Sequence, residues 1–329
     1  MQLRILGLVE VRDEQTGLHL LPTGAKQRAL LGALVVKAEH HVSVERLIDE
    51  LWGEHPPANA ANALQVHVAR LRRMLARPQR QDADQRAQRP WIMTTSRGYT
   101  MRLAPVETDA ARFGRLTDQA RRILPHDPWQ ASELLRRALS LWRGPALEGS
   151  VLGDICAGRA AQLEEDRLAA LEMLYEACLR TGRHGEITGE LVELTTDHPL
   201  REGFYGLLMV AYYRCGRQME ALRVYDRARG RMVRELGVEP GPALRCLMEA
   251  VLRHDPALAS APVPRPAGPC RGEAATSEAV DTGLAVEEEI ARLRLRIEHL
   301  QREQTHLLRR FDELTAGTPD RVPVGSGHL

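Results

Sequence analysis

The chain has 329 residues, of which 43% are hydrophobic and 4% aromatic, and its formal net charge is +1. This length accommodates two domains and a tail, and the scarcity of aromatic residues favours Ala- and Leu-rich helices over a β-sandwich. A net charge near zero excludes recognition of a polyanion through overall charge, but the charge is uneven. Residues 60–103 contain nine arginines and two aspartates, a local net charge of +7.

The N-terminal part of the chain shows alternating strand and helix patterns. Residues 2–11 and 18–21 read as short strands. Residues 24–38 then carry apolar side chains at helical spacing, and residues 43–53 do the same, with Ser43 placed to cap the second helix.

A third helix and a hairpin complete this part of the chain. Pro56 and Pro57 precede a helix that runs from about Asn59 to Leu75. After a polar loop, residues 91–103 are rich in strand-forming residues and fold back at an Arg-Gly turn, which predicts a β-hairpin. Strands, three helices and a hairpin within residues 1–105 are the outline of a winged helix-turn-helix domain with a small β-sheet and a wing.

The third predicted helix is amphipathic in an unusual way. Because each residue turns an α-helix by ~100°, one apolar stripe faces the core, formed by Leu64, Val68, Leu71 and Leu75. The opposite face and the two edges carry polar donors, namely Gln65, His67, Arg70, Arg72, Arg73 and Arg77. An arginine fork matches guanine O6 and N7, or phosphates, and glutamine matches adenine, in a major groove that admits a helix.

A solvated basic face is the alternative interpretation of these arginines. Two neighbouring features favour DNA instead. The preceding helix and tight turn fit helix-turn-helix geometry. The hairpin carries hydroxyl groups and a basic tip at Thr94, Thr95 and Arg97, which suit phosphates and the minor groove. Of the arginines near the middle of the helix, Arg73 is turned outward more squarely than Arg72.

Residues 108–256 consist almost entirely of helical patterns and contain an internal repeat. Gly182 and Gly216 occupy turn positions 34 residues apart, which is the tetratricopeptide period. The second unit carries signature residues at the expected offsets: Tyr205, Leu208, Tyr212, Ala221, Tyr225 and Ala228. Residues 131–142 fit a degenerate earlier unit. Such stacks form concave surfaces that bind partners, so we expect an all-α, tetratricopeptide-like repeat domain.

The C-terminal part changes character twice. Residues 257–283 are rich in Pro, Ala and Gly, which predicts a flexible linker. Residues 284–316 then carry a heptad seam that predicts a coiled-coil helix, and residues 317–329 a disordered tail. The seam comprises Val286, Ile290, Leu293, Ile297, Leu300, Gln304, Leu307, Phe311 and Leu314. The helix either self-associates, giving a homodimer or oligomer, or docks on its own chain.

The sequence offers no sign of catalysis. It lacks a GxxxxGK phosphate loop, an HExxH metal motif and a GxSxG nucleophile motif. Its twelve histidines show no metal-ligand spacing, and His40 and His41 are expected in a solvated loop. We therefore expect no catalytic residues, no bound metal and no cofactor.

The compartment follows from cysteine usage and hydropathy. The five cysteines form no Cys-x-x-Cys pair and no signal peptide is evident, so we expect reduced core thiols. No apolar run approaches the ~20 residues of a membrane span. A cytoplasmic protein without membrane contact is expected.

Three segments of the chain resemble a known protein family. Residues 30–75, "LLGALVVKAEHHVSVERLIDELWGEHPPANAANALQVHVARLRRML", resemble an OmpR-type winged helix, and more narrowly the Streptomyces antibiotic regulatory protein (SARP) family. Residues 138–149 and 220–255 resemble the bacterial transcriptional activator domain of that family. By position, the resemblance implies that Arg70 and Arg72 occupy the pair of sites that meets bases or backbone.

The resemblance also implies a function. SARP-like proteins are DNA-binding activators of secondary-metabolite gene clusters, which bind direct repeats near a promoter and help to recruit RNA polymerase. The expected partners are therefore double-stranded DNA and RNA polymerase. The alternative is a helical-repeat adaptor between proteins, without DNA binding.

Overall fold

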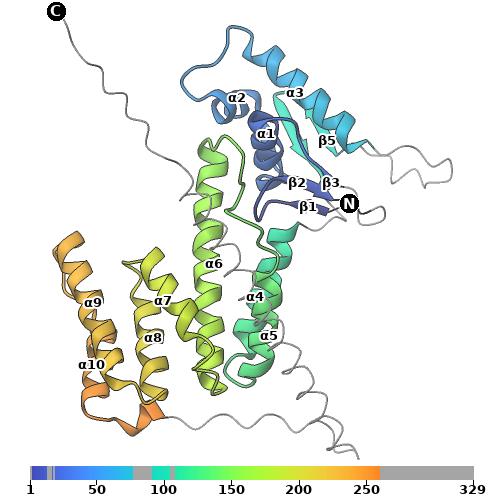
Figure 1. The fold of residues 1–329 in the computed structure, drawn as a ribbon. Coiled ribbons are helices and arrows are strands. Elements are labelled where there is room, and N and C mark those ends of the chain that lie inside the picture. Colours follow the sequence, from blue (N-terminus) through green and yellow to red (C-terminus); the bar gives the residue numbers. More distant parts are fainter. Residues whose placement is uncertain (1, 13–16, 18, 77–90, 104–107, 260–329) are drawn as a thin grey trace, which may run out of the picture. The chain divides into compact units, whose positions relative to one another are not determined.

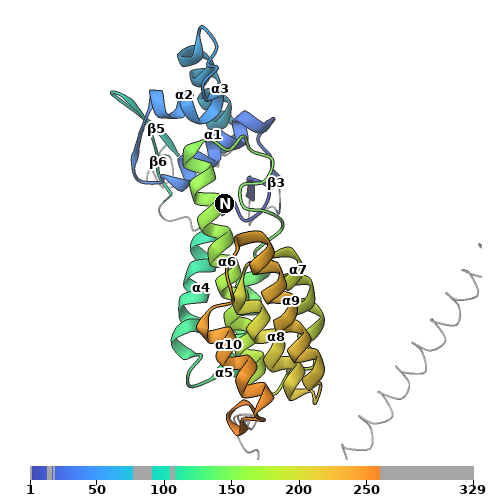
Figure 2. The ribbon, with the colours of Figure 1, turned by 90° about the vertical axis from the view of Figure 1, so that its left-hand side faces the viewer.

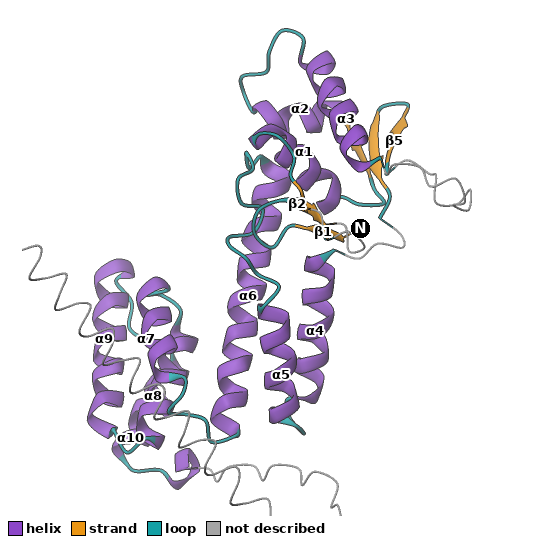
Figure 3. Ribbon diagram, turned by 45° about the vertical axis from the view of Figure 1, so that its right-hand side comes forward, coloured by secondary structure: helices purple, strands orange, loops and turns teal. Residues whose placement is uncertain are grey.

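The computed structural model describes residues 2–259 apart from 13–16, 18, 77–90 and 104–107 (Figure 1). The predicted coiled-coil helix, its seam, the final tail and most of the predicted linker lie outside the described residues, and so does Arg77. The statements made about them from the sequence remain predictions. The described strands are confined to the N-terminal part of the chain, and helices form the rest, as Figure 3 shows.

The chain begins with a three-stranded antiparallel sheet in the order β1-β2-β3. Its strands are β1 (Gln2–Arg4), β2 (Glu10–Arg12) and β3 (His19–Leu20). The single strand predicted over residues 2–11 is therefore wrong. Gly7 adopts a φ of 123°, a conformation open to glycine and costly for other residues, and the chain reverses there so that Leu3 pairs with Val11.

Three helices follow, as predicted: α1 (Ala25–Val36), α2 (Val44–Trp52) and α3 (Ala60–Leu75). The Ser43 hydroxyl accepts a hydrogen bond from the Arg46 backbone N–H at 3.3 Å and so caps α2. Gly53, with a φ of 56°, ends the same helix.

The wing belongs to a second antiparallel sheet, in the order β4-β6-β5. Its strands are β4 (His41–Ser43), β5 (Ile92–Thr95) and β6 (Gly98–Met101). The predicted hairpin is confirmed, but the loop predicted at His41 is wrong, because His41 begins β4 and pairs with Thr100. Gly98 makes this pairing possible, since a Cβ atom there would collide with the Val42 carbonyl.

The rest of the described chain is helical, as predicted. The elements are α4 (Asp109–Ile123), α5 (Pro128–Leu139), α6 (Asp154–Arg180), α7 (Thr188–Asp197), α8 (Glu202–Arg214), α9 (Gln218–Leu236), α10 (Pro242–Leu252) and a short 3-10 turn, η2 (Pro256–Ala259). Neighbouring helices α7, α8, α9 and α10 pack in sequence, as Figure 2 shows. Five of the six signature residues are buried between α8 and α9, and Tyr212 is half-buried.

The long helix α6 joins the helical repeats to the winged helix. It contacts α1 and α2 as well as α5 and α8. The Glu50 side chain of α2, only 2% exposed, accepts hydrogen bonds from the backbone N–H groups of Ile155 (2.7 Å) and Cys156 (3.0 Å). These N–H groups lie in the first turn of α6, where they have no partner within the helix and where the helix dipole attracts negative charge. The carboxylate therefore holds α6 against α2.

A second buried carboxylate joins α4 to the N-terminal sheet. Asp109, fully buried in the first turn of α4, accepts hydrogen bonds from the N–H groups of Ile5 (2.8 Å) and Leu6 (3.0 Å). Arg143 contacts both Asp109 (3.3 Å) and Glu10 (3.0 Å). Burial raises the pKa of Asp109, whereas the two backbone N–H groups and Arg143 favour its ionised form.

The expectation of core thiols holds for two of the four described cysteines. Cys156 and Cys178 are buried, and burial raises the pKa of both thiols. Cys215 is half-buried and Cys246 is exposed, which corrects the expectation for Cys246. None of the described helices has the length and apolar character needed to cross a membrane.

The buried Glu50 contact predicts a measurable stability effect. Glu50→Gln keeps the shape of the side chain but removes its charge and leaves an amide NH2 facing an N–H donor. We expect the free energy of unfolding to fall by about 1–3 kcal/mol, measured by urea denaturation. The control is Asp49→Asn on the exposed side of the same helix, which should change it by less than about 0.5 kcal/mol. Equal effects of the two variants would contradict the role assigned to Glu50.

Candidate DNA-binding interface

The rotation of α3 about its axis is set by its apolar stripe. Leu64, Val68, Leu71 and Leu75 are each at most 1% exposed. They pack where α3 meets α1 and α2, so the opposite side of α3 faces away from the core. This agrees with the helical spacing of the sequence and determines which polar residues a ligand can reach.

Three of the predicted contact residues lie on the outward face of α3. Gln65, Arg70 and Arg73 are exposed. Within the part of the chain that the structure describes, neither arginine forms an ion pair, in contrast to Arg121, which pairs with Asp118 at 2.6 Å. No carboxylate of the described residues therefore occupies either guanidinium group, and both are exposed to an external anion.

The outward face also carries two residues that were not predicted as contacts. Val66 is 48% exposed with the exposed Ala69 beside it, and Asn62 is exposed one turn earlier. The sequence pattern places Val66 outward, but its apolar character gave no reason to name it as a contact. The signal for both is their spacing, since Asn62, Val66 and Arg70 follow one another at intervals of four residues and so share one side of the helix. An asparagine amide matches adenine in the major groove as a glutamine amide does.

His67 lies at the edge of the core and is not on the outward face. Its ring stacks obliquely on Trp52 of α2, with 6.1 Å between ring centroids, and its Nδ1 atom is buried without a partner among the described residues. The Lys26 ammonium lies 4.9 Å from the centroid of the Trp52 ring. Burial, followed by the charges of Arg70 and Lys26, lowers the pKa of His67 and so favours its neutral form.

Arg72 and Thr94 are brought together, and they bind each other. The Arg72 guanidinium donates through Nε to the Ile92 carbonyl (3.1 Å) and through Nη2 to the Thr94 hydroxyl (2.8 Å). It also lies 6.0 Å from the centroid of the Tyr99 ring. Arg72 thus ties α3 to β5, the two elements that lie side by side in Figure 3.

The tip of the wing is a two-residue turn. Thr95 pairs with Gly98 across it, and the turn leaves Arg97 exposed without an ion pair among the described residues. The Thr95 hydroxyl and His41 Nδ1 are 2.9 Å apart, and the Arg97 carbonyl accepts a hydrogen bond from the Val44 N–H at 3.1 Å. These contacts fix the wing to the start of α2.

The described side chains at this interface are mainly hydrogen-bond donors. No three side chains among their His, Cys, Asp and Glu residues gather in a group that would hold a metal ion. The interface combines exposed arginine forks, a glutamine amide and wing hydroxyl groups, which are the donors that address phosphates and base edges.

Family comparisons agree with this architecture. The family "Transcriptional regulatory protein, C terminal" matches residues 19–99. The family "Bacterial transcriptional activator domain" matches residues 108–252. Together the two matches cover both the winged helix and the helical repeats, in the order in which the structure contains them.

Individual regulatory proteins also match most of this chain. The transcriptional regulator RedD of Streptomyces coelicolor is 41% identical over 78% of this chain and 72% of its own. The regulatory protein DnrI of Streptomyces peucetius is 36% identical over 78% of this chain and 94% of its own. The regulatory protein AfsR of Streptomyces coelicolor is 41% identical over 78% of this chain, but the match covers only 24% of that larger protein.

A solved structure shows the same fold. Mycobacterium tuberculosis EmbR, in complex with a low affinity phosphopeptide, superposes with a TM-score of 0.70 at 30% sequence identity. The match covers 78% of this chain and 68% of that one. With an outward-facing arginine helix, a wing, a helical-repeat domain and these relatives, the chain belongs to the SARP family of DNA-binding transcriptional regulators.

Proposed function

We propose that this protein activates the genes of one secondary-metabolite pathway, an antibiotic cluster, by binding direct repeats near a promoter and recruiting RNA polymerase. The observation that carries the proposal is the outward face of α3, where Arg70 and Arg73 are exposed without a carboxylate partner among the described residues. The relatives named above support transcriptional regulation. The choice of pathway, repeats and polymerase follows from the family resemblance.

In this proposal α3 enters the major groove and the wing lies over the adjacent minor groove. Gln65, Arg70 and Arg73 meet base edges, and Arg97 with Thr95 meets phosphates. Arg72 serves mainly to position the helix against the wing, because its Nε and Nη2 atoms already donate hydrogen bonds to Ile92 and Thr94. His67 supports α3 from the core edge.

Direct repeats require two copies of the protein in the same orientation on DNA. A parallel two-stranded coiled coil instead relates its chains by a two-fold axis. The predicted linker, residues 257–283, has an r.m.s. span of about 30 Å if it behaves as a flexible chain. A linker of this span would let the winged helices bind direct repeats in the same orientation while the coiled coil keeps its two-fold axis. The predicted coiled coil therefore joins the copies without setting the orientation of their winged helices.

Arg73→Ala tests base readout. If Arg73 reads a base, the variant should bind a cognate promoter fragment about 1–3 kcal/mol more weakly, because a bidentate contact is lost while the buried stripe of α3 is untouched. Gel-shift titration measures the affinity, and circular dichroism should show unchanged helicity. Arg121→Ala, which removes an exposed arginine of α4, is the matched control and should bind as the wild type does.

Salt separates this function from the adaptor alternative. Affinity should fall by about 10³ or more between 50 and 200 mM salt if six or more phosphates are contacted. An adaptor without DNA binding would give no complex at any salt concentration. Unchanged affinity of Arg73→Ala would remove that residue from the interface.

Val66 is a second candidate for sequence recognition, through contact with a thymine base. Its exposed methyl groups lie between Gln65 and Arg70, and the small side chain of Ala69 leaves room for close approach to a base. Apolar side chains contact the thymine C5-methyl group in the major groove. Replacing single thymines of the bound site by deoxyuridine should weaken wild-type binding about fourfold at one position per repeat, the value of one buried methyl group.

The same replacements should have no effect at that position in Val66→Ala, because the partner of the methyl group is gone. Thymines outside the repeats serve as controls. If the deoxyuridine effect is the same in wild type and variant at every position, Val66 does not read thymine.

The C-terminal seam predicts self-association. Deleting residues 284–315 should lower the mass measured by multi-angle light scattering from that of an oligomer to that of a single chain, because the apolar seam is lost. A variant with Gln304→Leu keeps the seam and should retain or increase the oligomer mass. An unchanged mass after deletion would favour a helix docked on its own chain.

A further inference from the structure

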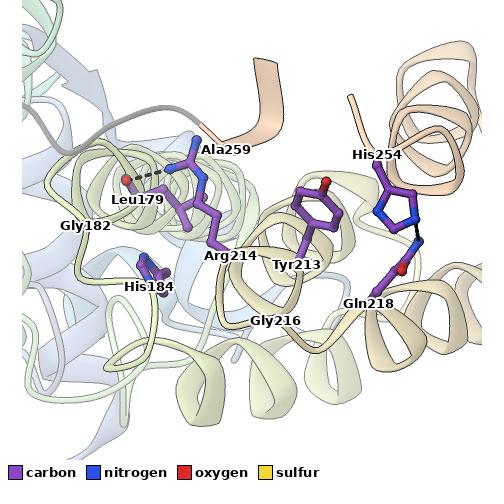
Figure 4. Close-up of a pocket in the computed structure, with 9 residues that line it drawn as sticks. All are labelled: Leu179, Gly182, His184, Tyr213, Arg214, Gly216, Gln218, His254 and Ala259. Atoms are coloured by element: carbon purple, nitrogen blue, oxygen red, sulfur yellow. Dashed lines mark hydrogen bonds between the residues drawn. The ribbon is translucent and has the colours of Figure 1, made fainter. Parts of the chain in front are cut away.

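A cavity of about 570 Å³ lies where two successive helical repeats meet (Figure 4). Its walls come from the turn after α6, the end of α8, the start of α9, the end of α10 and η2. Three pairs of lining residues are equivalent positions of the two repeats, separated by 34 residues in each case. They are Leu179 with Tyr213, Gly182 with Gly216, and His184 with Gln218.

The cavity is therefore formed by equivalent positions of two successive repeats. Gly182 and Gly216 have φ values of 76° and 74°, which glycine adopts without strain. Each turn closes a helix and directs the next segment along the same side of the stack. The equivalent side chains of the two units consequently face one shared space. The cavity volume falls in the range of ligand sites, about 300–1,000 Å³.

Arg214 is the main charge in this cavity. Its Nε donates to the Leu258 carbonyl at 2.9 Å and its Nη1 to the Leu179 carbonyl at 2.6 Å. These two bonds fix the guanidinium plane, and Nη2 has no partner among the described residues. Burial lowers the pKa of Arg214, and no carboxylate of the described residues offsets that effect.

Arg214 lacks a carboxylate partner among the described residues, as Arg72 does, whereas two other partly buried arginines have such partners. Arg143 contacts Glu10 and Asp109, and Arg201 contacts Glu165 and Glu172. Within the described ranges Arg214 forms no ion pair. A cation held in a cavity without a counter-charge is a site for an external anion, because pairing recovers the cost of removing the charge from water.

Two imidazoles add polar groups to the same walls. His184 Nδ1 is buried and has no hydrogen-bond partner among the described residues. His254 Nε2 lies 3.4 Å from the Gln218 side-chain amide, as the dashed line in Figure 4 shows. Buried polar atoms normally have a partner, so the His184 nitrogen is available to a ligand oxygen. The Leu179 and Tyr213 side chains supply apolar surface beside it.

We propose that this cavity binds a small organic anion with an apolar body. The anionic group, a carboxylate, sulfonate or phosphate ester, pairs with the Arg214 guanidinium and accepts a hydrogen bond from the Nδ1–H of His184. The apolar body lies against Leu179 and Tyr213. This site is separate from the DNA-binding face and does not rest on the function proposed above.

The test uses two probes of nearly the same shape and different charge, with the full-length protein. One is 8-anilinonaphthalene-1-sulfonate, and the other is the uncharged N-phenyl-1-naphthylamine. Fluorescence titration gives the dissociation constant of each. Arg214→Met keeps the apolar stem and removes the charge, so it should weaken sulfonate binding by about tenfold or more and leave binding of the neutral probe within about twofold.

Two further variants keep the test decisive. Arg253→Met removes an exposed arginine of the neighbouring helix end, which pairs with Glu249 at 3.6 Å, and should leave both dissociation constants unchanged. His184→Leu removes an imidazole that supports no hydrogen bond through Nδ1 among the described residues. This variant should weaken binding of the sulfonate probe severalfold, with no change in helicity. If Arg214→Met unfolds, His184→Leu still tests the proposal.

Two outcomes would overturn the proposal. In one, the sulfonate binds Arg214→Met and His184→Leu as tightly as it binds the wild type. In the other, the folded variants lose the neutral probe to the same extent as the sulfonate, which would mean that the cavity only accepts apolar groups.

Discussion

The burial of four apolar side chains fixes the orientation of α3, and the function depends on that orientation. Leu64, Val68, Leu71 and Leu75 are removed from water against α1 and α2. Burying a side chain of this size stabilises the fold by about 1.5–3 kcal/mol. Because the helix cannot rotate without exposing them, Arg70 and Arg73 must face solvent. Hydrophobic packing thus positions charges that the described part of the protein leaves unpaired.

Arg72 and Arg73, which are adjacent on α3, have different roles. Arg73 has no ion pair among the described residues, whereas the guanidinium nitrogens of Arg72, the preceding residue, donate to Ile92 and Thr94. The contacts of Arg72 matter because α3 ends at Leu75 and the wing begins only at Ile92. By joining them, Arg72 sets the distance between the element proposed for the major groove and the element proposed for the minor groove.

Buried carboxylates join the helical repeats to the winged helix. Glu50 of α2 and the first turn of α6 form a charge-to-helix-end contact, and Asp109 links α4 to the N-terminal sheet. Both contacts satisfy backbone N–H groups that would otherwise be buried without partners. The attachment between the two domains is therefore made by specific polar contacts as well as by apolar packing.

Local patterns predicted much of this structure. The spacing of leucines identified the core side of α3, because helix geometry depends only on neighbouring residues, and the 34-residue period identified the repeats. The sequence did not reveal β4, a three-residue strand that exists through its pairing with β6. The Glu50 contact joins residues 105 positions apart, and the role of Arg72 depends on a strand 20 positions away. Such contacts form only in the folded chain.

Methylation interference on a bound promoter fragment shows whether Arg73 reads guanine, because methylation of guanine N7 blocks an arginine fork in the major groove. We expect that methylation of one guanine in each repeat prevents binding of the wild-type protein and no longer affects the residual binding of Arg73→Ala. Interference at no guanine, or the same interference in both proteins, would contradict a groove-reading role for the exposed guanidinium of Arg73.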